Sequence, residues 1–210
     1  MSRESVLHKV RTALGRSAGQ PVEEPLPPRL VVPAVPMEHR IRSFRERIEA
    51  LAGKTYEAMS AIDACEYVSG VLAGRTAVAS NSPILRDCRI SSLAGVQSGI
   101  TDAAELRAVC STAACGISGA DFGLADTGTL VMLSSREEAR LISLLPPVYI
   151  AVVARERLLT GLDELLTILP HPAEQTSSMV LITGPSRTAD IEQILVRGVH
   201  GPGEIHVVVV

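Results

Sequence analysis

Aromatic side chains and basic charge are both in short supply in this 210-residue chain. Aromatic residues make up 2% of the sequence, and tryptophan is absent, so successive bases of a nucleic-acid strand would find no stacking platform. The formal net charge is −3 and the sequence pI is about 6.0, which is the opposite of a basic binding face. Both shortages argue against nucleic acid as a partner.

Long apolar runs are missing as well. No stretch can span a bilayer, and the closing EIHVVVV is far too short for that role. The opening MSRESVLHKVRTALGRS has neither the apolar stretch nor the small-residue cleavage site of a secretory signal. We therefore expect a cytoplasmic protein with no membrane segment, whose mean hydropathy of +0.26 reflects a well-buried core.

Sequence signals for metals and common cofactors are also lacking. The four cysteines include no C-x-x-C pair and no zinc or iron–sulfur spacing, which favours small buried thiols. No strand is followed by G-x-G-x-x-G, and neither a P-loop, a G-x-S-x-G elbow nor H-E-x-x-H occurs. We expect no metal and no cofactor in this chain.

The chain is organised as an arm followed by one large domain. Apolar positions at helical spacing predict a helix over residues 4–14, and the next segment is so rich in proline that it can form only an extended linker. Residues 1–36 are thus the N-terminal helical arm with its linker. Residues 37–210, with 46% apolar and 20% charged residues in the whole chain, suit one globular domain.

Helical and strand-like segments alternate along the domain, which predicts an α/β fold with a mostly parallel sheet flanked by helices. Thr101 is a candidate cap of one helix, and Gly53 ends another. The expected helices are 38–53, 62–73, 101–110, 162–169 and a last one from Ser186 or Thr188 to Gly198. The expected strands are 75–80, 127–134, 147–154, 177–184 and 205–210, and we expect them to be covered on both faces.

Two loops carry candidate chemistry on the rule that ligands of open α/β sheets collect beyond the carboxyl ends of the strands. The first loop lies in GISGADFGLADTGTLVM, residues 116–132, where Asp126, Thr127 and Thr129 supply short polar side chains and Gly128 allows close backbone approach. The competing interpretation is a turn that satisfies its own backbone.

The second loop lies in LITGPSRTADIEQILVRGVHGPGE, residues 181–204. A turn at Gly184 leads to Ser186, Arg187 and Thr188, where a helix N-terminus and a guanidinium could hold an anion. Acidic residues at 190 and 192 already complement such a helix end, which favours a mono-anion over a phosphate. The alternative is an ordinary turn at each end of a helix.

His200 lies in the glycine- and proline-rich turn before the last strand. A histidine there could act as an acid or base, because its ordinary pKa is close to neutrality. The alternative is a histidine that hydrogen-bonds the loop backbone. His200 and Asp126 are the candidate catalytic residues.

Three motifs in order, GISGADFGLADTGTLVM, ARLISLLPPVYIAVV and TGPSRTADIEQILVRGVHGP, resemble the lactate utilization protein C family, which are stand-alone LUD-domain proteins. The resemblance covers about residues 40–210. The family pattern falls on these residues: Asp126, Thr127, Gly128, Thr129, Arg140, Pro146, Gly184, Pro185, Ser186, Arg187, Thr188, Asp190, His200, Gly201 and Pro202.

This resemblance implies a fold similar to the sugar-isomerase and CoA-transferase-like superfamily. It also implies a non-redox role in oxidising L-lactate to pyruvate with two partners, lactate utilization proteins A and B, which carry the iron–sulfur clusters. The hydroxyls and Arg187 suit a small carboxylate, and Arg140 is a second cation that could close on it.

Three hypotheses remain open from the sequence: a carboxylate-binding subunit of that system, a stand-alone isomerase- or acyl-transferase-like enzyme, and a non-catalytic assembly factor. The first predicts that Arg187→Ala abolishes growth on lactate without unfolding the chain, and the second that the purified chain turns over alone. The third predicts that deleting residues 1–36 is the more harmful change. A homo-oligomer is also left open.

Overall fold

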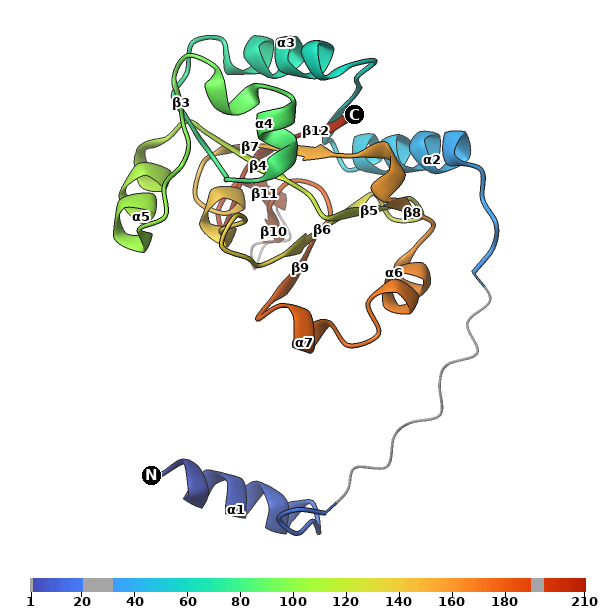
Figure 1. The fold of residues 1–210 in the computed structure, drawn as a ribbon, viewed down its shortest axis with the longest axis vertical. Coiled ribbons are helices and arrows are strands. Elements are labelled where there is room, and N and C mark those ends of the chain that lie inside the picture. The colour runs from blue at the N-terminus through green and yellow to red at the C-terminus, as the bar shows by residue number, and fades with distance from the viewer. Residues whose placement is uncertain (1, 21–31, 190–194) are drawn as a thin grey trace. The chain divides into compact units, whose positions relative to one another are not determined.

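The structure, a computed structural model, describes residues 2–20, 32–189 and 195–210 (Figure 1). The chain divides into two units, residues 1–31 and residues 32–210. The first unit contains α1 (Arg3–Ala13), which begins where the Ser2 hydroxyl accepts a hydrogen bond from the Ser5 amide. This is the predicted helical arm. Most of the predicted linker, residues 21–31, lies outside the described residues.

The second unit is built on a six-stranded sheet in which every neighbouring pair is parallel. This confirms the predicted α/β class. In spatial order its strands are β1 (Lys54–Glu57), β12 (Glu204–Val209), β7 (Val148–Val153), β4 (Cys115–Gly119), β2 (Ala77–Ala79) and β3 (Val96–Gln97).

A second sheet of four strands contains two strands that the sequence had suggested for the parallel sheet. Its order is β8 (Leu158–Leu159), β5 (Phe122–Leu124), β6 (Thr129–Leu133) and β9 (Met179–Ile182). β6 is antiparallel to both of its neighbours, because a short turn joins it to β5 and β9 enters from the other direction. Strand β9 is also only partly buried, so the expectation of two covered faces was wrong for it.

Helices complete the unit. They are α2 (Met37–Ala50), α3 (Ala61–Leu72), α4 (Pro83–Asp87), α5 (Ala103–Thr112), α6 (Leu162–Ile168) and α7 (Pro172–Gln175), with 3-10 turns η1 (Ile90–Ser92), η2 (Arg140–Ser143) and η3 (Arg155–Arg157). The helix predicted over 101–110 forms, but its cap is Asp102 and not Thr101: the Asp102 carboxylate accepts hydrogen bonds from two amides of the first turn. Likewise α2 ends through Ala52 at φ 64°, one residue before Gly53.

The layers follow from the two-residue period of the central strands. Val148, Ile150 and Val152 of β7 pack with α3 and α4 on one face of the parallel sheet. Alternate residues such as Tyr149 and Ala151 pack against α2 and the second sheet on the other face. Figure 1 shows the same arrangement, with α3 and α4 on the side of the parallel sheet away from β6, β9 and α6. No helix of the described residues is both apolar enough and long enough to cross a membrane.

The helix predicted from residue 186 or 188 to Gly198 is wrong at both of its ends. Residues Arg187–Ala189 form β10 and residues Leu195–Arg197 form β11, which pair antiparallel. Residues 190–194, including Asp190 and Glu192, lie outside the described residues. Glycines at positive φ, Gly184 at 74° and Gly198 at 79°, reverse the chain just outside the two strands. The predicted anion site at residues 186–188 therefore lacks the helix N-terminus on which the prediction was based.

Candidate functional site

The turn at residues 183–187 and the turn at residues 198–202 meet beside the parallel sheet. The Ser186 amide donates to the Pro202 carbonyl at 2.8 Å, and the Gly198 amide donates to the Ser186 carbonyl at 3.0 Å. The turn after β9 is thereby joined to the turn before β12. The structure thus brings together the two motifs around Gly184–Thr188 and His200–Pro202.

Small residues allow this close approach. A Cβ atom at Gly201 would lie 3.3 Å from Ser186 Cβ, tighter than most such contacts. Gly184 has a positive φ of 74°, and a side chain there would meet Leu51 Cβ at 3.0 Å. The two glycines thus serve the packing of the turns against each other and against the end of α2.

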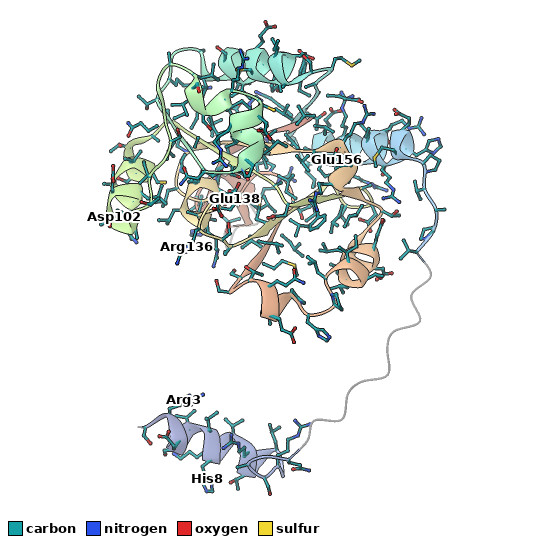
Figure 2. All side chains as sticks on the ribbon, viewed as in Figure 1. Arg3, His8, Asp102, Arg136, Glu138 and Glu156 are labelled. Carbon is teal, nitrogen blue, oxygen red and sulfur yellow. The ribbon has the colours of Figure 1, made fainter. Side chains whose placement is uncertain are left out.

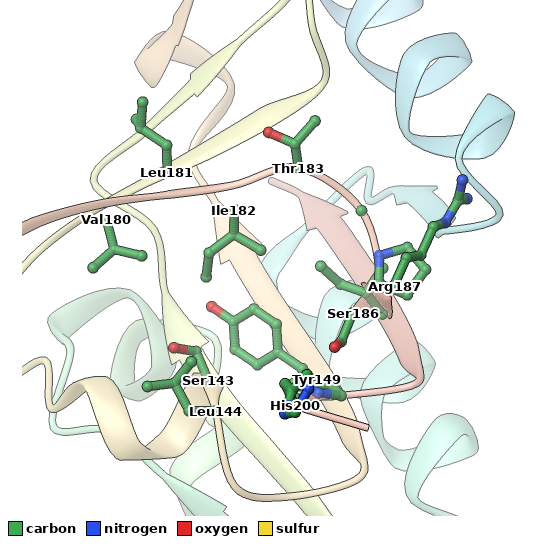
Figure 3. Close-up of a pocket in the computed structure, with 15 residues that line it drawn as sticks. Ser143, Leu144, Tyr149, Val180, Leu181, Ile182, Thr183, Ser186, Arg187 and His200 are labelled. Carbon is green, nitrogen blue, oxygen red and sulfur yellow. The ribbon is translucent and has the colours of Figure 1, made fainter. Parts of the chain in front are cut away.

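The two turns form one side of an open pocket of about 320 Å³ (Figure 3). This volume is at the small end of the range for ligand sites. The pocket is lined by Ser143, Leu144, Tyr149, Val180, Leu181, Ile182, Thr183, Gly184, Pro185, Ser186, Arg187, His200, Gly201, Pro202 and Ile205.

The pocket lies at an unexpected edge of the parallel sheet. Tyr149 and Ile205 are the second residues of β7 and β12, so the pocket adjoins the amino ends of these strands. The sequence rule placed ligands at the carboxyl ends. The strand whose carboxyl end adjoins the pocket is β9 of the second sheet. Thr183 and Gly184 follow this strand directly, and both line the pocket.

The charges around the pocket favour an anion. Arg187 and His200 line it, and none of its described lining residues is acidic. Ser143, Thr183 and Ser186 add hydroxyl groups that can donate hydrogen bonds. The remaining surface is mostly apolar, from residues of β9 and the neighbouring turns. Such a lining suits a small molecule with one carboxylate and a short apolar part.

Arg187 is held in a way that the sequence did not suggest. Its Nη2 donates to the carbonyl of Leu51 at the end of α2. In Figure 3 the side chain runs toward that helix, whereas Tyr149, Ser186 and His200 lie together at the pocket. The guanidinium therefore anchors the turn to the end of α2. To bind a carboxylate through two N–H groups, it has to leave the Leu51 carbonyl.

Tyr149 forms the buried wall of the pocket. Its hydroxyl is 2.7 Å from Ser118 Oγ and also donates to Met132 Sδ at 3.7 Å. Burial, as the largest cause, raises the pKa of Tyr149 well above its ordinary value, and the Ser118 hydrogen bond opposes the rise. Tyr149 is thus a neutral phenol at physiological pH.

The other predicted loop is a closed turn. Thr127 Oγ1 donates to Asp126 Oδ1 at 3.2 Å, and Thr129 Oγ1 lies 2.8 Å from both Thr127 Oγ1 and Thr183 Oγ1. Gly128 has a φ of 67° and lies against α2, where a Cβ would be 2.8 Å from the Ile48 amide nitrogen. These hydroxyls bond other side chains, whereas the competing interpretation from the sequence was a turn that satisfies its own backbone.

The remaining candidate residues lie apart from the pocket. Asp126 lines a different hollow, of about 260 Å³, next to Asp163 and Glu164, and so does not face His200. Thr188 pairs with Val196 in the β10–β11 hairpin. Arg140 begins η2 and lines a second cavity, of about 10 Å³. Thr129 contacts the pocket lining through its hydroxyl, which lies 2.8 Å from that of Thr183.

Three polar residues of the pocket were missed by the sequence analysis. Ser143, Tyr149 and Thr183 reach the pocket from η2, β7 and the end of β9. Tyr149 carried a detectable signal, since a tyrosine inside the apolar run PVYIAVVA needs a partner for its hydroxyl. The serine and threonine carried none.

Metal and thiol chemistry find little support in the described part of the chain. No group of three or more histidine, cysteine or acidic residues is placed there to hold a metal ion. Cys88, Cys110 and Cys115 are buried and Cys65 is half-buried, and burial raises the pKa of all four thiols. They are therefore poor nucleophiles.

A parallel sheet backed by a small mixed sheet, with helices around them and a pocket lined from both sheets, defines an α/β domain. A family model described as the LUD domain matches residues 41–210, and the chain belongs to this family. Among solved structures, a DUF162 family protein from Deinococcus radiodurans superposes with a TM-score of 0.65 at 17% identity, covering 83% of this chain and 98% of that one. This likeness shows the fold.

Several relatives carry the name lactate utilization protein C. The protein from Oceanobacillus iheyensis is 34% identical over 110 residues, which is 50% of this chain and 47% of that protein. The one from Halalkalibacterium halodurans is 42% identical over 91 residues, 41% of this chain and 40% of the relative. The Bacillus subtilis protein is 40% identical over 91 residues, 41% and 38% respectively. The match spans less than half the length of each of these relatives.

Proposed function

We propose that this chain binds a small carboxylate in the pocket between the 183–187 and 198–202 turns and acts as a non-redox subunit of a cytoplasmic lactate utilization system. In this system the chain works with lactate utilization proteins A and B, whose iron–sulfur clusters take the electrons as L-lactate becomes pyruvate. Membership of the LUD domain family and relatives named lactate utilization protein C support the role.

One observation carries the carboxylate proposal: Ser186, Arg187 and His200 line a single pocket that has no acidic residue among its described lining. A hydrogen bond to a charged group contributes about 1.5–3 kcal/mol, roughly twice a neutral one. An arginine, a histidine and a serine hydroxyl therefore favour a mono-carboxylate over a neutral molecule. The volume of about 320 Å³ accommodates lactate or pyruvate readily.

Each polar residue has a distinct part in this proposal. Ser186 donates its hydroxyl to the carboxylate, and its position is fixed by the backbone hydrogen bonds to Pro202 and Gly198. His200 is the acid–base group, placed to exchange a proton with the 2-hydroxyl or 2-oxo oxygen. Arg187 holds the turn against α2 in the unliganded chain and turns to the carboxylate on binding.

The test is a calorimetric and thermal-shift titration of the purified chain with L-lactate, pyruvate, glycolate, a sugar phosphate and CoA. A ligand at 100 times its dissociation constant stabilises the fold by about 2.7 kcal/mol. We expect this for one or more of the small carboxylates in the wild type. Ser186→Ala combined with His200→Gln is expected to remove it.

Asp126→Asn is the matched control, because Asp126 lies in the closed turn and should leave binding unchanged. Stabilisation by CoA or a sugar phosphate, without any by carboxylates, would contradict the proposal and favour an isomerase- or transferase-like enzyme. Stabilisation by none of the five ligands would contradict carboxylate binding by the chain alone.

A further inference from the structure

Behind the pocket lies a buried carboxyl group that the sequence analysis did not single out. Glu138 belongs to the loop between β6 and η2 (Figure 2), where it is half-buried, while Arg136 of the same loop is exposed. Ser135 Oγ accepts hydrogen bonds from the amides of Glu137 and Glu138, at 3.1 and 3.0 Å. This turn directs the Glu138 side chain inward.

One oxygen of the Glu138 carboxyl is tightly held at the carboxyl ends of β2 and β4. Ser80 Oγ and the Gly119 amide both donate to Oε1, each at 2.9 Å. Ser80 is 2% exposed, so these donors are shielded from water. A Cβ at Gly119 would lie 2.9 Å from Oε1 and would also collide with Ser82 Oγ. Position 119 therefore has room only for glycine.

The other oxygen, Oε2, is buried and has no hydrogen-bond partner among the described residues. Ser134 Oγ is buried without a partner in the same way. Both residues line a cavity of about 10 Å³, which has room for roughly one water molecule. Because a buried water needs polar partners, two unpartnered oxygens around a one-water space are what such a water requires.

This cavity adjoins the pocket. Ser143 and Val180 line both spaces, and Met132, which lines the cavity, accepts the hydrogen bond of the pocket residue Tyr149. A ligand in the pocket is therefore separated from the Glu138 carboxyl by little more than the shared residues. A negative charge on Glu138 would repel an anion there, because water screens the charge of a buried carboxylate only weakly.

Resting on the function proposed above, we propose that Glu138 and a water held between it and Ser134 form the proton-exchanging end of the carboxylate pocket, so that a mono-anionic ligand binds together with one proton. The ligand arrives as an anion. The proton comes from solvent, passes to the Oε2 oxygen, and leaves when the ligand leaves. The protonation state of Glu138 thereby controls whether an anionic ligand binds, although Glu138 does not contact the ligand.

The surrounding charges agree with a carboxyl that changes protonation near neutrality. Burial, as the largest cause, raises the pKa of Glu138 to about 7, while hydrogen bonds from Ser80, Ser82 and Gly119 oppose the rise. The charged or titratable groups that neighbouring elements contribute are Asp121 after β4, Tyr149 on β7, Arg140 on η2, Arg86 on α4, and Arg136 and Glu137 on the same loop. Asp121 adds to the rise.

The experiment measures pyruvate and L-lactate affinity by calorimetry at pH 6 and pH 8, in buffers of different ionisation enthalpy so that proton uptake is read directly. If only the protonated Glu138 admits the anion, the competent fraction falls from about nine-tenths to about one-tenth, and affinity falls roughly tenfold. Proton uptake at pH 8 is then close to one per ligand. In E138Q both the fall and the uptake disappear, since the amide keeps an acceptor for Ser80 and Gly119.

Three further variants keep the result interpretable. E137Q removes the same charge from the neighbouring exposed residue and should retain the tenfold fall. H200Q removes the histidine of the pocket and should weaken binding at both pH values but retain the proton uptake at pH 8. S134A removes the second polar partner of the water and should move the midpoint of the fall to higher pH.

Carboxylate binding with the same pH dependence in wild type and E138Q overturns this inference and leaves the proposed function intact, as does wild-type binding that takes up no proton. Absence of any carboxylate binding at pH 6 in wild type and E138Q alike overturns the proposed function, and this inference with it.

Discussion

Residues 126–129 and residues 183–187 are both short turns with one glycine at positive φ and with hydroxyl side chains, yet their polar groups end up in opposite situations. In the first turn, Thr127 and Thr129 bond each other and α2 covers the glycine. In the second, Ser186 uses its backbone to join the 198–202 turn, and its side chain lines a pocket.

The difference between these turns lies in what packs on them. Gly128 lies against the backbone of α2 and so closes the first turn from outside. The atoms nearest to a Cβ at Gly184 belong to the Leu51 side chain, and the second turn is hydrogen-bonded to the neighbouring 198–202 turn. Composition alone therefore does not distinguish a self-satisfied turn from a binding turn. The polar atoms have to be followed to their partners.

The largest loss of stability is expected when a side chain is added to the glycine of the first turn. Gly128→Ala places a Cβ 2.8 Å from the Ile48 amide nitrogen in a left-handed backbone conformation, so we expect a loss of about 3 kcal/mol of unfolding free energy. Gly184→Ala, whose Cβ would lie 3.0 Å from Leu51 Cβ and not against a backbone atom, should cost about 1–2 kcal/mol. Urea denaturation of both variants measures the two losses. Equal losses would mean that the two turns are equally closed.

A pH effect of similar size is expected at the buried carboxyl behind the second turn. Below pH 4.5 Glu138 is protonated in both the folded and the unfolded chain. As the pH rises toward the folded pKa of about 7, only the unfolded chain ionises, so the unfolding free energy falls by about 3 kcal/mol. Denaturation at pH 5 and pH 7 should show about 2 kcal/mol of this fall in wild type and a smaller fall in Glu138→Gln. Parallel falls in both proteins would contradict the assignment.

A smaller effect concerns binding at the second turn. Ser186→Ala removes one hydrogen bond to a charged carboxylate, worth about 1.5–3 kcal/mol, so carboxylate affinity should drop roughly tenfold or more while the thermal midpoint of the unliganded chain changes little. Thr127→Ala in the first turn serves as the comparison. A larger loss of affinity in Thr127→Ala than in Ser186→Ala would reverse the roles assigned to the two turns.

The smallest effect is expected for Asp126→Asn. Asp126 is exposed and its carboxylate receives one hydrogen bond, from Thr127, so both stability and carboxylate affinity should stay within about 0.5 kcal/mol of wild type. Chemical denaturation and calorimetry check this. A loss of lactate-dependent activity in the assembled system with Asp126→Asn would restore it as a catalytic candidate.

Local periodicity predicted the parts of the fold that local sequence controls. Ile41, Phe44 and Ile48 are all buried on α2, as their helical spacing indicated. The same reasoning failed for residues 186–198, whose apolar spacing also fits a helix. There the β10–β11 pairing and the reversals at Gly184 and Gly198 override local preference. Strand β6 shows the same limit, because one of its two partners, β9, is distant in the sequence.

The candidate site was predictable only where its residues are adjacent in sequence. Ser186, Arg187 and His200 belong to two recognisable turns, and the structure brings these turns together. Thr183 and Ser143 come from apolar surroundings without any pattern of their own. Glu138 looks like one more charged residue of an exposed SSREEAR loop, and only the tertiary contacts of Ser80 and Gly119 reveal that it is held inside.

The most direct test of the pocket is to titrate the isotope-labelled chain with L-lactate and pyruvate and follow its backbone amide signals by NMR. Binding at the proposed site predicts that the largest shifts occur at the amides of Ser186, Gly198 and Gly201, while those of Thr127 and Gly128 remain in place. Shifts centred on Thr127 and Gly128, or none at millimolar ligand, would contradict the assignment of the pocket between the 183–187 and 198–202 turns as the carboxylate site.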